Sequence, residues 1–516
     1  MIILVHDNTK TVQLLNFDLE VIEVSLNKQI PIALIEVSKQ FPETLIIWCH
    51  EAFVNSINTA ALSSIFHHKR ILASYNPSFV NYLPNQIGYI DREFFLKIKT
   101  SVSYPTWLTS SNIGGVYSSV INSLVNQLNP KVSFDYFLNS LAKRAMVNGL
   151  FCYSEPKLLQ ENTSVIVETQ QASISDLFLF VKQHYKWVWV FFLSISYFVY
   201  EKKIVLFPLL KSLFFKQLST DLNLEAIPVK STKTIIDTKT IDVIIPTIGR
   251  KQYLYDVLQD LAAQTLLPKN VIIVEQNPLQ ESVSELDYLK TENWPFIIKH
   301  TFTHQLGVVN ARNMALSQVT SEWVLLGDDD NRFNEFLIEE LLDRISCFGV
   351  ASGLTVYLQS HEKQSFFKTG QTSIFGGGNA IIKSSLLSTV FFNSKYEFNY
   401  GEDTDFGMQI RLSGEDVIYF SDIKIDHIKA PIGGYRTKVK QPWADDAIQP
   451  KPSPTIMLLN ETYFTKEQLL GYKLLLGIRN FKHTKTKNPL NYIKSYNKQW
   501  RQSQLWSSKL KSKTNA

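Results

Sequence analysis

The chain has 516 residues, of which 45% are hydrophobic and 19% are charged, and its formal net charge is +5. This length suits two or three packed domains, and this composition excludes an intrinsically disordered chain. The three cysteines, Cys49, Cys152 and Cys347, form no closely spaced pair, which excludes a disulfide framework or a zinc ribbon and indicates a reducing compartment. Because the first residues lack the basic and apolar regions of a signal peptide, we expect a cytoplasmic protein.

Short apolar runs such as Leu45–Trp48 and Arg70–Ala73, with helical patterns between them, predict a mixed α/β domain over residues 1–168. Residues 169–237 form an aromatic-rich helical segment that ends in a polar linker. Its longest uncharged run, Trp187–Tyr200, has 14 residues, fewer than the about 20 needed to span a bilayer. Two interpretations stay open for this run. One is a buried helix pair that joins two domains, and the other is an interfacial helix flanked by lysines at a membrane surface.

A new domain is expected over residues 238–440. Ile241–Thr247 has the pattern of a strand, the next segment has helical spacing, and Val271–Val274 is a second strand. In such a β-α-β unit the two strands are parallel, so their carboxyl ends meet at one edge of the sheet. Glu275 follows the second strand, where its carboxylate can accept hydrogen bonds from a base or a ribose.

Three consecutive aspartates, Asp328, Asp329 and Asp330, follow the apolar run Glu322–Gly327. Carboxylates at the end of such a strand face the crevice in which open α/β sheets bind ligands. Two of them separated by one residue can share a hard divalent cation, which can in turn hold a diphosphate. Arg312, at the start of a short helix, can direct its guanidinium at phosphate oxygens. Taken singly, the aspartates are equally compatible with a chance match or a helix cap, and Arg312 with a surface salt bridge.

Together these segments resemble family 2 glycosyltransferases in order and spacing. The resemblance covers roughly residues 241–436 and is carried by Ile244–Arg250, Gln264–Pro268, Val271–Val274, Gly307–Asn313, Asp328–Asp330, Gly376–Ala380 and Tyr400–Asp405. It implies a GT-A fold, which is a Rossmann-like mixed sheet, a nucleotide-diphosphate sugar donor and a divalent metal. The residues that it implies for donor binding are Pro246, Thr247, Arg250, Glu275, Arg312, Asp328 and Asp329. Glu275-Gln276 departs from the Asp-Asp or Asp-Asn of many relatives, which puts the identity of the bound base in doubt.

The resemblance also implies a metal site. Asp330 is expected as the direct ligand, with Asp328 nearer the ribose and the metal's waters. His427 stands where many GT-A enzymes place a third ligand, although a structural histidine is the alternative. Oxygen-rich ligation favours Mn²⁺ or Mg²⁺, and such a cation can neutralise the charge on a leaving diphosphate.

Glu402 and Asp403 open a predicted helix at the place where the family keeps its base. The positive helix end keeps a nearby carboxylate ionised, so we expect Asp403 to act as the base and Glu402 to position the acceptor. Helix capping is the alternative for this pair. Displacement assisted by a single base inverts the anomeric centre, as the family generally does. Acceptor contacts are expected from Gly377, Gly378 and Asn379, and a mobile flap with a phosphate-binding arginine is expected at Gly433–Arg436.

The sequence therefore predicts an inverting glycosyltransferase that extends a cell-surface polysaccharide, with a glycan or lipid-linked acceptor. One alternative is a catalytically silent GT-A protein that binds glycan or serves as a scaffold. Another is a sugar nucleotidyltransferase, which would favour a loop rich in glycine and basic residues after the first strand. We expect a cytoplasmic location with peripheral contact to the inner face of the cell membrane.

Residues 1–168 are interpreted as a degenerate, non-catalytic GT-A copy. Cys49-His50-Glu51 stands where the D-x-D motif would be, and Ser111–Val116 resembles Phe375–Ala380. Neighbouring strand residues point to opposite faces, so Cys49, His50 and Glu51 are not expected to hold a metal. A role in acceptor binding, dimerisation or orientation is the hypothesis for this domain.

Residues 441–516 are expected to form a basic helical extension. From Gln468 onward there are eleven Lys or Arg residues and no Asp or Glu. Contact with an anionic membrane and a solvated basic tail are both compatible with this pattern. No segment matches a nucleic-acid-binding module.

Overall fold

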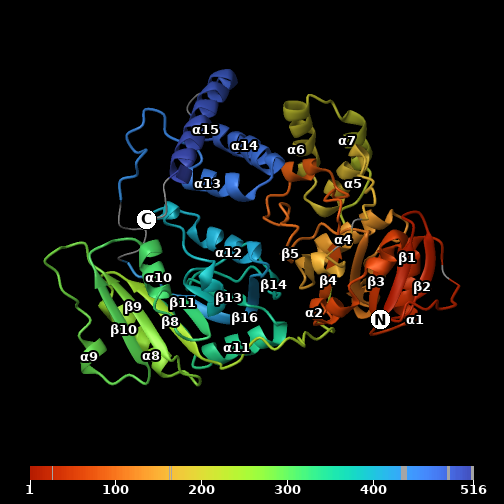
Figure 1. Ribbon diagram of the computed structural model, residues 1–516. Helices are drawn as coiled ribbons and strands as arrows, with labels where there is room; N and C mark the ends of the chain where they lie inside the picture. The colour runs from red at the N-terminus through yellow and green to blue at the C-terminus, as the bar shows by residue number, and fades with distance from the viewer. Residues whose placement is uncertain (26, 162, 164, 432–438, 485–487, 513–516) are drawn as a thin grey trace. The chain divides into compact units, whose positions relative to one another are not determined.

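The computed structural model describes residues 1–25, 27–161, 163, 165–431, 439–484 and 488–512 (Figure 1). The chain forms two compact units, each with its own mixed sheet. The first unit comprises Met1–Lys233 and Phe464–Leu476, and the second comprises Thr234–Tyr463 and Gly477–Ala516. The flap expected at Gly433–Arg436 lies outside the described residues.

The sheet of the second unit is parallel on one side and mixed on the other. Its strands in lateral order are β10 (Ile297–Thr303), β9 (Asn270–Gln276), β8 (Ile241–Thr247), β11 (Trp323–Gly327), β15 (Asn379–Lys383), β13 (Ser352–Leu358), β16 (Ile418–His427) and β12 (Asn331–Arg332), and β14 (Gly370–Gln371) pairs with β16. The first four are parallel to one another, whereas β15 runs antiparallel to both β11 and β13. Strands β8, β9 and β11 are buried on both faces, as expected of parallel strands covered by helices on either side.

The helices of the second unit are α8 (Lys251–Ala262), α9 (Tyr288–Thr291), α10 (Val308–Leu316), α11 (Leu337–Phe348), α12 (Glu402–Leu412), α13 (Pro454–Tyr463) and α15 (Pro489–Ser512), with 3₁₀ turns at Ser384–Ser388 and Ser394–Tyr396. Helix α11 buries Leu337, Leu341 and Ile345 along one face and ends at Gly349, whose φ of 62° suits glycine. Helix α13 is tied to α12 by Tyr463, whose hydroxyl donates to Asp405 Oδ1 at 2.8 Å. This hydrogen bond attaches helix α12, which carries the predicted base Asp403, to a helix that follows it in the chain.

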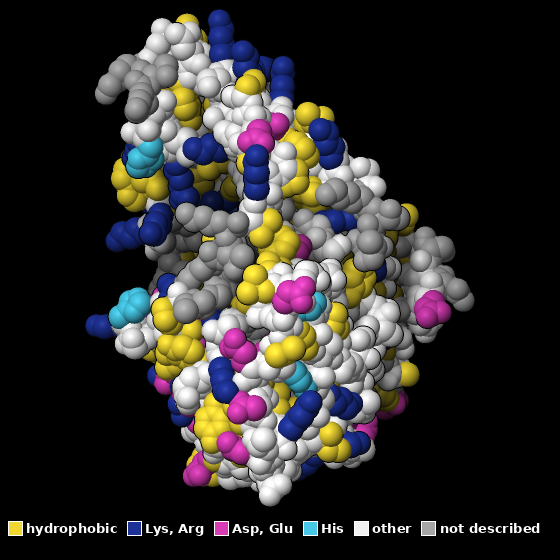
Figure 2. All heavy atoms as spheres, turned by 90° about the vertical axis from the view of Figure 1, so that its left-hand side faces the viewer, with side chains coloured by type: hydrophobic (Ala, Val, Ile, Leu, Met, Phe, Trp, Pro, Cys, Tyr) yellow, Lys and Arg dark blue, Asp and Glu magenta, His cyan; other side chains and the backbone are white. Residues whose placement is uncertain are grey.

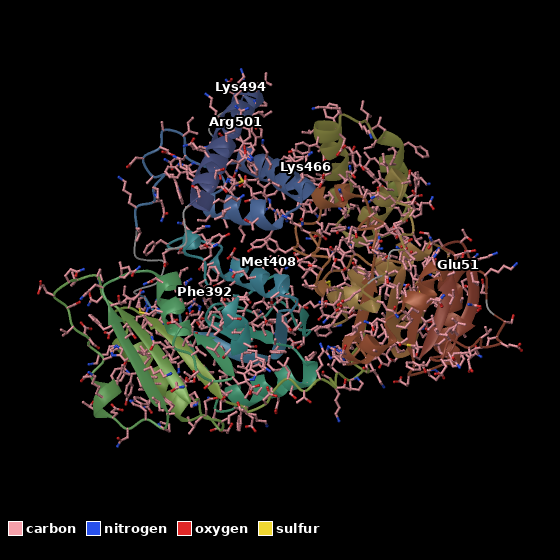
Figure 3. The ribbon with its side chains drawn as sticks, viewed as in Figure 1. Glu51, Phe392, Met408, Lys466, Lys494 and Arg501 are labelled. Atoms are coloured by element: carbon pink, nitrogen blue, oxygen red, sulfur yellow. The ribbon has the colours of Figure 1, made fainter. Side chains whose placement is uncertain are left out.

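The C-terminal extension is helical, as the fold prediction required. Trp506 of α15 packs against Trp443, and its Nε1 donates to Asp446. Lys494 and Arg501 are exposed on α15 (Figure 3). In Figure 2 the Lys and Arg side chains gather at the upper end of the face shown, over the C-terminal helices. Helix α14 (Lys466–Phe481) precedes α15 in the chain.

The first unit is also α/β. Its strands in lateral order are β2 (Thr11–Leu15), β1 (Ile2–His6), β3 (Leu45–His50), β6 (Ile113–Tyr117), β4 (Ile71–Tyr75), β7 (Phe151–Ser154) and β5 (Tyr104–Pro105). Its helices are α1 (Ile30–Gln40), α2 (Leu62–Ile65), α3 (Ser118–Leu124), α4 (Phe134–Met146), α5 (Ile174–His184), α6 (Val188–Ser196) and α7 (Leu206–Leu213), with 3₁₀ turns at Glu51–Ser56, Thr59–Ala61, Asn85–Tyr89, Val125–Gln127 and Pro156–Leu158 and a π turn at Tyr197–Glu201.

The two sheets share one topology. Strands β1, β3, β6, β4 and β7 correspond to β8, β11, β15, β13 and β16 in lateral order, in chain order and in direction. The short strand β5 lies antiparallel to β7, as β14 lies antiparallel to β16. Where the second unit adds β9 and β10, the first unit has the antiparallel strand β2. The first unit thus repeats the strand order of the second in a shortened sheet.

The aromatic-rich segment folds as a layer of three helices in the first unit. Leu177 and Val181 of α5, Val190 and Leu193 of α6 and Leu209 of α7 belong to one buried core. Within the described residues, no helix is both long and apolar enough to cross a bilayer. One side of each of these helices is therefore buried in the core of the first unit.

Candidate active site

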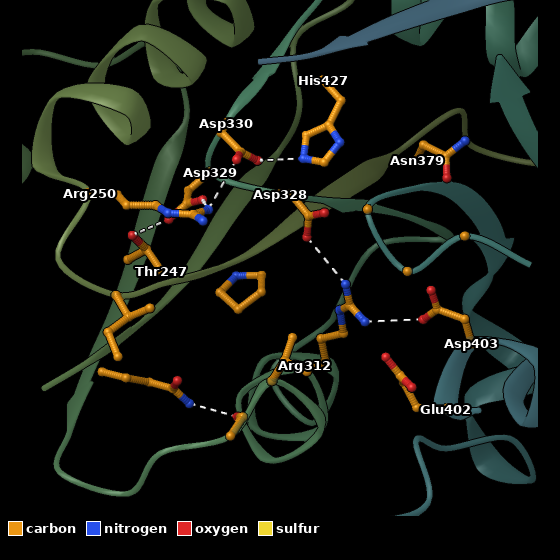
Figure 4. Close-up of a pocket in the computed structure, with 18 of the residues that line it drawn as sticks. Thr247, Arg250, Arg312, Asp328, Asp329, Asp330, Asn379, Glu402, Asp403 and His427 are labelled. Carbon is orange, nitrogen blue, oxygen red and sulfur yellow. Dashed lines mark hydrogen bonds and ion pairs between the residues drawn. The ribbon is translucent and has the colours of Figure 1, made fainter. Parts of the chain in front are cut away.

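A cavity of about 450 Å³ opens at the carboxyl ends of β8 and β11 in the second unit (Figure 4). It brings together nearly all the side chains expected from the sequence. The expected residues that line it are Pro246, Thr247, Arg250, Arg312, Asp328, Asp329, Asp330, Gly377, Gly378, Asn379, Glu402, Asp403 and His427. Glu275 is the expected residue that does not line it.

Asp329 anchors the loop after β8. Its carboxylate accepts hydrogen bonds from the Thr247 hydroxyl at 2.7 Å and from Arg250 Nη1 at 2.5 Å. Burial raises the pKa of Asp329 to about 6, although the Arg250 guanidinium opposes this rise. Since this side chain is buried and already bonded on both oxygens, its carboxylate holds Thr247 and Arg250 in position at the cavity.

Asp330 faces His427 at the end of β16. Its Oδ1 lies 3.4 Å from His427 Nε2, and its Oδ2 accepts from the Ala430 amide at 2.8 Å and from Arg250 at 3.2 Å. Burial alone would raise the pKa of Asp330, but His427 and Arg250 outweigh it, so the pKa lies below its usual value. The pKa of His427 is correspondingly raised by its hydrogen bond to Asp330. The carboxylate is therefore kept ionised.

Arg312 joins the two ends of the cavity. Its Nη2 lies 3.2 Å from Asp328 Oδ1, and its Nη1 lies 3.2 Å from Asp403 Oδ1 (Figure 4). Its guanidinium also lies over the Phe392 ring, 5.2 Å from the ring centroid. Arg312 belongs to α10, and Glu397 holds the N-terminus of this helix. The Glu397 carboxylate accepts hydrogen bonds from the backbone amides of Val309 and Asn310 in the first turn.

Asp403 lies at the first turn of α12, and its side chain remains 37% exposed to the cavity. The surrounding protein limits its contact with water and so raises its pKa, an effect that Arg312 partly offsets. Glu402, beside it, is buried. A carboxylate with a raised pKa holds a proton more readily, which is the property required of a general base.

The glycine loop before β15 passes close to these charged groups. A Cβ on Gly378 would overlap the Asp328 carboxylate, and one on Gly377 would overlap both Arg312 and Asp403. These two positions therefore require glycine for close approach rather than for turn geometry. The Asn379 side chain is buried and donates to the Thr355 carbonyl of β13 at 2.8 Å.

Glu275 points away from the cavity. Its carboxylate lies 2.9 Å from His300 Nε2 of β10 and accepts from the Glu285 amide. Gln276 lines the cavity instead and donates to the Gly307 carbonyl at 2.7 Å. Neighbouring residues of a strand face opposite sides of the sheet, so Glu275 and Gln276 cannot both face the cavity. This alternation was the sequence signal that could have pointed to Gln276.

Sequence reasoning missed Tyr357. Its hydroxyl lies 2.8 Å from Asn331 Oδ1 and 3.1 Å from Asp328 Oδ2, so its one proton can be donated to either oxygen, and its ring stacks on His427 with centroids 4.7 Å apart. Lys429 and Glu397 also line the cavity and were missed. No local motif marks Tyr357, because it reaches the cavity from β13, which is separated from β11 by β15.

The donor set suits a hard divalent cation. Two carboxylates, Asp328 and Asp330, and the His427 imidazole line one cavity, and oxygen ligands with an imidazole fit Mn²⁺ or Mg²⁺. Within the described residues, no three His, Cys, Asp or Glu side chains are already gathered as metal ligands. In this structure the guanidinium groups of Arg250 and Arg312 balance the carboxylates. The chemistry of the residues present therefore fits the metal that the resemblance implies.

The strand registers place His50 of the first unit where the second unit has Asp328. Cys49 pairs with Ile113 at the start of β6, as Gly327 pairs with Asn379 at the start of β15. The His50 imidazole accepts from the Ala52 amide, so it caps a turn. The first unit thus lacks the D-x-D carboxylates at this edge.

The base position is nevertheless occupied in the first unit. Asp135 is the second residue of α4, as Asp403 is the second residue of α12. Asp135 accepts from the Ser111 amide at 3.1 Å, and Asp403 accepts from the Gly377 amide. The first unit therefore has a carboxylate at the position that corresponds to Asp403 and none at the position that corresponds to Asp328.

Residues 242–365 match the model of the family described as Glycosyl transferase family 2. Residues 242–365 of the second unit are therefore part of a family 2 glycosyltransferase domain with a GT-A fold, and the family prediction made from the motifs is confirmed. No curated protein matches the chain.

Solved structures give distant likenesses. S. aureus TarS 1–349 in complex with UDP-GlcNAc is 17% identical with a TM-score of 0.37, over 52% of this chain and 89% of that one. The same TarS fragment without a named ligand is 16% identical with a TM-score of 0.36, over 52% and 88%. GalNAc-T7 with UDP, GalNAc and Mn²⁺ is 11% identical with a TM-score of 0.37, over 50% and 55%. The assignment depends on the family match and the strand topology and not on these likenesses.

Proposed function

We propose that the second unit is an inverting, metal-dependent glycosyltransferase. Its donor is a nucleotide-diphosphate sugar, and its acceptor is a hydroxyl of a glycan or lipid-linked glycan in cell-surface polysaccharide synthesis. The observation that carries the proposal is that Arg312 contacts Asp328 and Asp403 at once. A group for the diphosphate and a group for the acceptor proton are thereby present in one cavity of ligand size.

In this proposal the chain supplies binding, orientation and a base. Arg250 and Arg312 hold the phosphate oxygens of the donor. Gln276 lines the cavity and is available to bind the nucleobase of the donor. Asp328, Asp330 and His427 would hold Mn²⁺ or Mg²⁺, which neutralises the charge that develops on the leaving diphosphate. The glycine backbone at 377–378 allows Asp328, Arg312 and Asp403 to pack closely beside it.

The acceptor hydroxyl attacks the anomeric carbon from the side opposite the diphosphate. The new carbon–oxygen bond forms as the bond to the diphosphate oxygen breaks, and the hydroxyl proton passes to Asp403. Glu402 orients the acceptor. One displacement of this kind inverts the anomeric centre, through a state with oxocarbenium character.

The test is calorimetric titration of the full chain with UDP, GDP, dTDP and CDP, with and without Mn²⁺. We expect metal-dependent binding of at least one nucleotide, loss of that binding in Asp330→Ala and its retention in Asp343→Ala, an exposed aspartate of α11. If no nucleotide binds, the proposal fails and the silent scaffold becomes the better reading. The first unit is proposed to be non-catalytic, because His50 stands where a metal carboxylate is needed.

A further inference from the structure

The outer side of α6 and α7 in the first unit is an exposed apolar surface. On α6 it follows a helical stripe through Trp187, Phe191, Ile195 and Phe198. On α7 and its flanks the members are Ile204, Leu206, Phe207, Leu210, Leu213 and Phe214. We call these two sets the apolar stripes. Phe207 is 72% exposed and Phe214 is 89% exposed.

Both helices are mainly apolar, although α7 also carries the exposed Lys211, and each helix has a second side that is buried. Val190, Leu193 and Tyr197 of the α6 segment and Leu209 of α7 pack in the core with α5. The apolar stripes therefore lie on the sides of α6 and α7 that are turned away from this core. The two helices stand side by side in Figure 1. A large apolar surface of this kind is normally covered, so the stripes indicate a missing partner.

The charges around the stripes indicate what the partner is. Lys186 precedes α6, Lys202 and Lys203 separate it from α7, and Lys216 follows α7. All four are exposed, and none is in an ion pair within the part of the chain that the structure describes. Cations at both ends of an apolar surface suit lipid headgroups that carry negative charge.

One acidic residue, Glu201, lies among the lysines of residues 177–218. Its carboxylate is half-buried, accepts from the Tyr89 hydroxyl at 2.6 Å and from Gln86 at 3.3 Å, and interacts with Lys203. The outer surface of the helix pair therefore combines bulky apolar groups with net positive charge.

We propose that α6 and α7 dock the first unit on an anionic membrane surface. The helices lie in the plane of the interface, with the apolar stripes among the acyl chains and the lysines at the phosphates. Exposed Trp187, which contacts Phe191 edge to face at 5.7 Å between centroids, lies at headgroup depth. The helices do not span the bilayer, in keeping with the absence of a spanning helix among the described residues. The proposal stands independently of the donor chemistry.

The experiment is co-sedimentation of the full chain with vesicles of phosphatidylcholine alone or of equimolar phosphatidylcholine and phosphatidylglycerol. We expect binding to the anionic vesicles that weakens as salt rises. Phe207→Ser with Phe214→Ser should weaken it roughly ten-fold or more, since two large apolar groups are removed. Lys202→Gln with Lys203→Gln should weaken it roughly thirty-fold, at about five-fold for each lysine near the surface.

The matched control is Phe79→Ser with Leu279→Ser, which removes exposed apolar side chains elsewhere and should leave vesicle binding unchanged. Nucleotide binding by every variant reports that the second unit is intact, and circular dichroism reports the fold. The proposal is overturned if the native chain stays in the supernatant with both vesicles, or if the Phe207/Phe214 variant sediments like the native chain. It is also overturned if these substitutions only dissociate a dimer, because the stripes would then bind a second copy.

Discussion

Arg312 Nη1 lies 3.2 Å from Asp403 Oδ1, and the same guanidinium contacts Asp328 on the opposite side of the cavity. The cation lowers the pKa of Asp403, which the surrounding protein raises. Arg312 is thus in a position to bind phosphate and to tune the proposed base at once.

We predict that Arg312→Gln lowers the transfer rate by roughly 10²- to 10³-fold, the effect of removing one charged group that stabilises a transition state. The acid limb of the pH–rate profile should also move to higher pH, because the pKa of Asp403 is no longer lowered by the cation. Arg344→Gln, at a surface ion pair with Asp422, is the control. An unchanged pH–rate profile in Arg312→Gln would show that Arg312 does not set the pKa of Asp403.

The second prediction separates binding from chemistry. Asp403→Asn should keep metal-dependent nucleotide binding while transfer falls by roughly 10²- to 10⁴-fold, the usual effect of losing a general base. Asp330→Ala should lose both. Calorimetry and a transfer assay on the same preparations measure the two quantities. Equal loss of nucleotide binding in both variants would contradict the assigned roles.

The third prediction concerns the glycine loop. Gly378→Ala should abolish transfer, because the added methyl group would overlap the Asp328 carboxylate. Gly327→Ala is the matched control on the other side of Asp328, since the nearest atom to its added Cβ lies 3.6 Å away. Transfer assays and thermal unfolding of both variants check this. Similar activity in the two would mean that the loop can move aside.

The fourth prediction is a dependence of stability on pH. Burial lowers the pKa of His184 to about 3, and its ring contacts Ser140 Oγ at 2.8 Å. Below pH 6.5 the unfolded chain binds a proton there and the folded chain does not, so stability falls as the pH drops from 6.5 toward 3. At pH 5 the loss due to His184 is about 2 kcal/mol. Denaturant unfolding at pH 7 and pH 5 should show a smaller pH effect in His184→Gln than in the native chain, and an equal effect would refute the assignment.

The fifth prediction addresses the first unit. Asp135→Asn should leave transfer unchanged, because the first unit lacks the carboxylates of the metal position beside it. The transfer assay with Asp403→Asn as the positive control measures this. A loss of transfer in Asp135→Asn, with the fold retained by circular dichroism, would assign the first unit a catalytic part.

Much of the site was predictable because its motifs are local. Asp328–Asp330 follow a buried strand and Glu402-Asp403 begin a helix, and both facts are legible in a short window of sequence. The interpretation of the first unit had the same local basis, since Cys49 and His50 end a strand. Glu275 was expected beside the donor, but it does not line the cavity, whereas the neighbouring Gln276 does.

The sequence by itself determined the strands, the family and most of the side chains that line the cavity, because apolar patterns and strand-end motifs depend on neighbours in the chain. Only the tertiary structure decided that Arg312 links Asp328 to Asp403, that Tyr357 stacks on His427, and which side of α6 and α7 is left uncovered. These relationships join residues of different strands and helices, and an apolar helix does not record in its sequence which of its sides finds a partner.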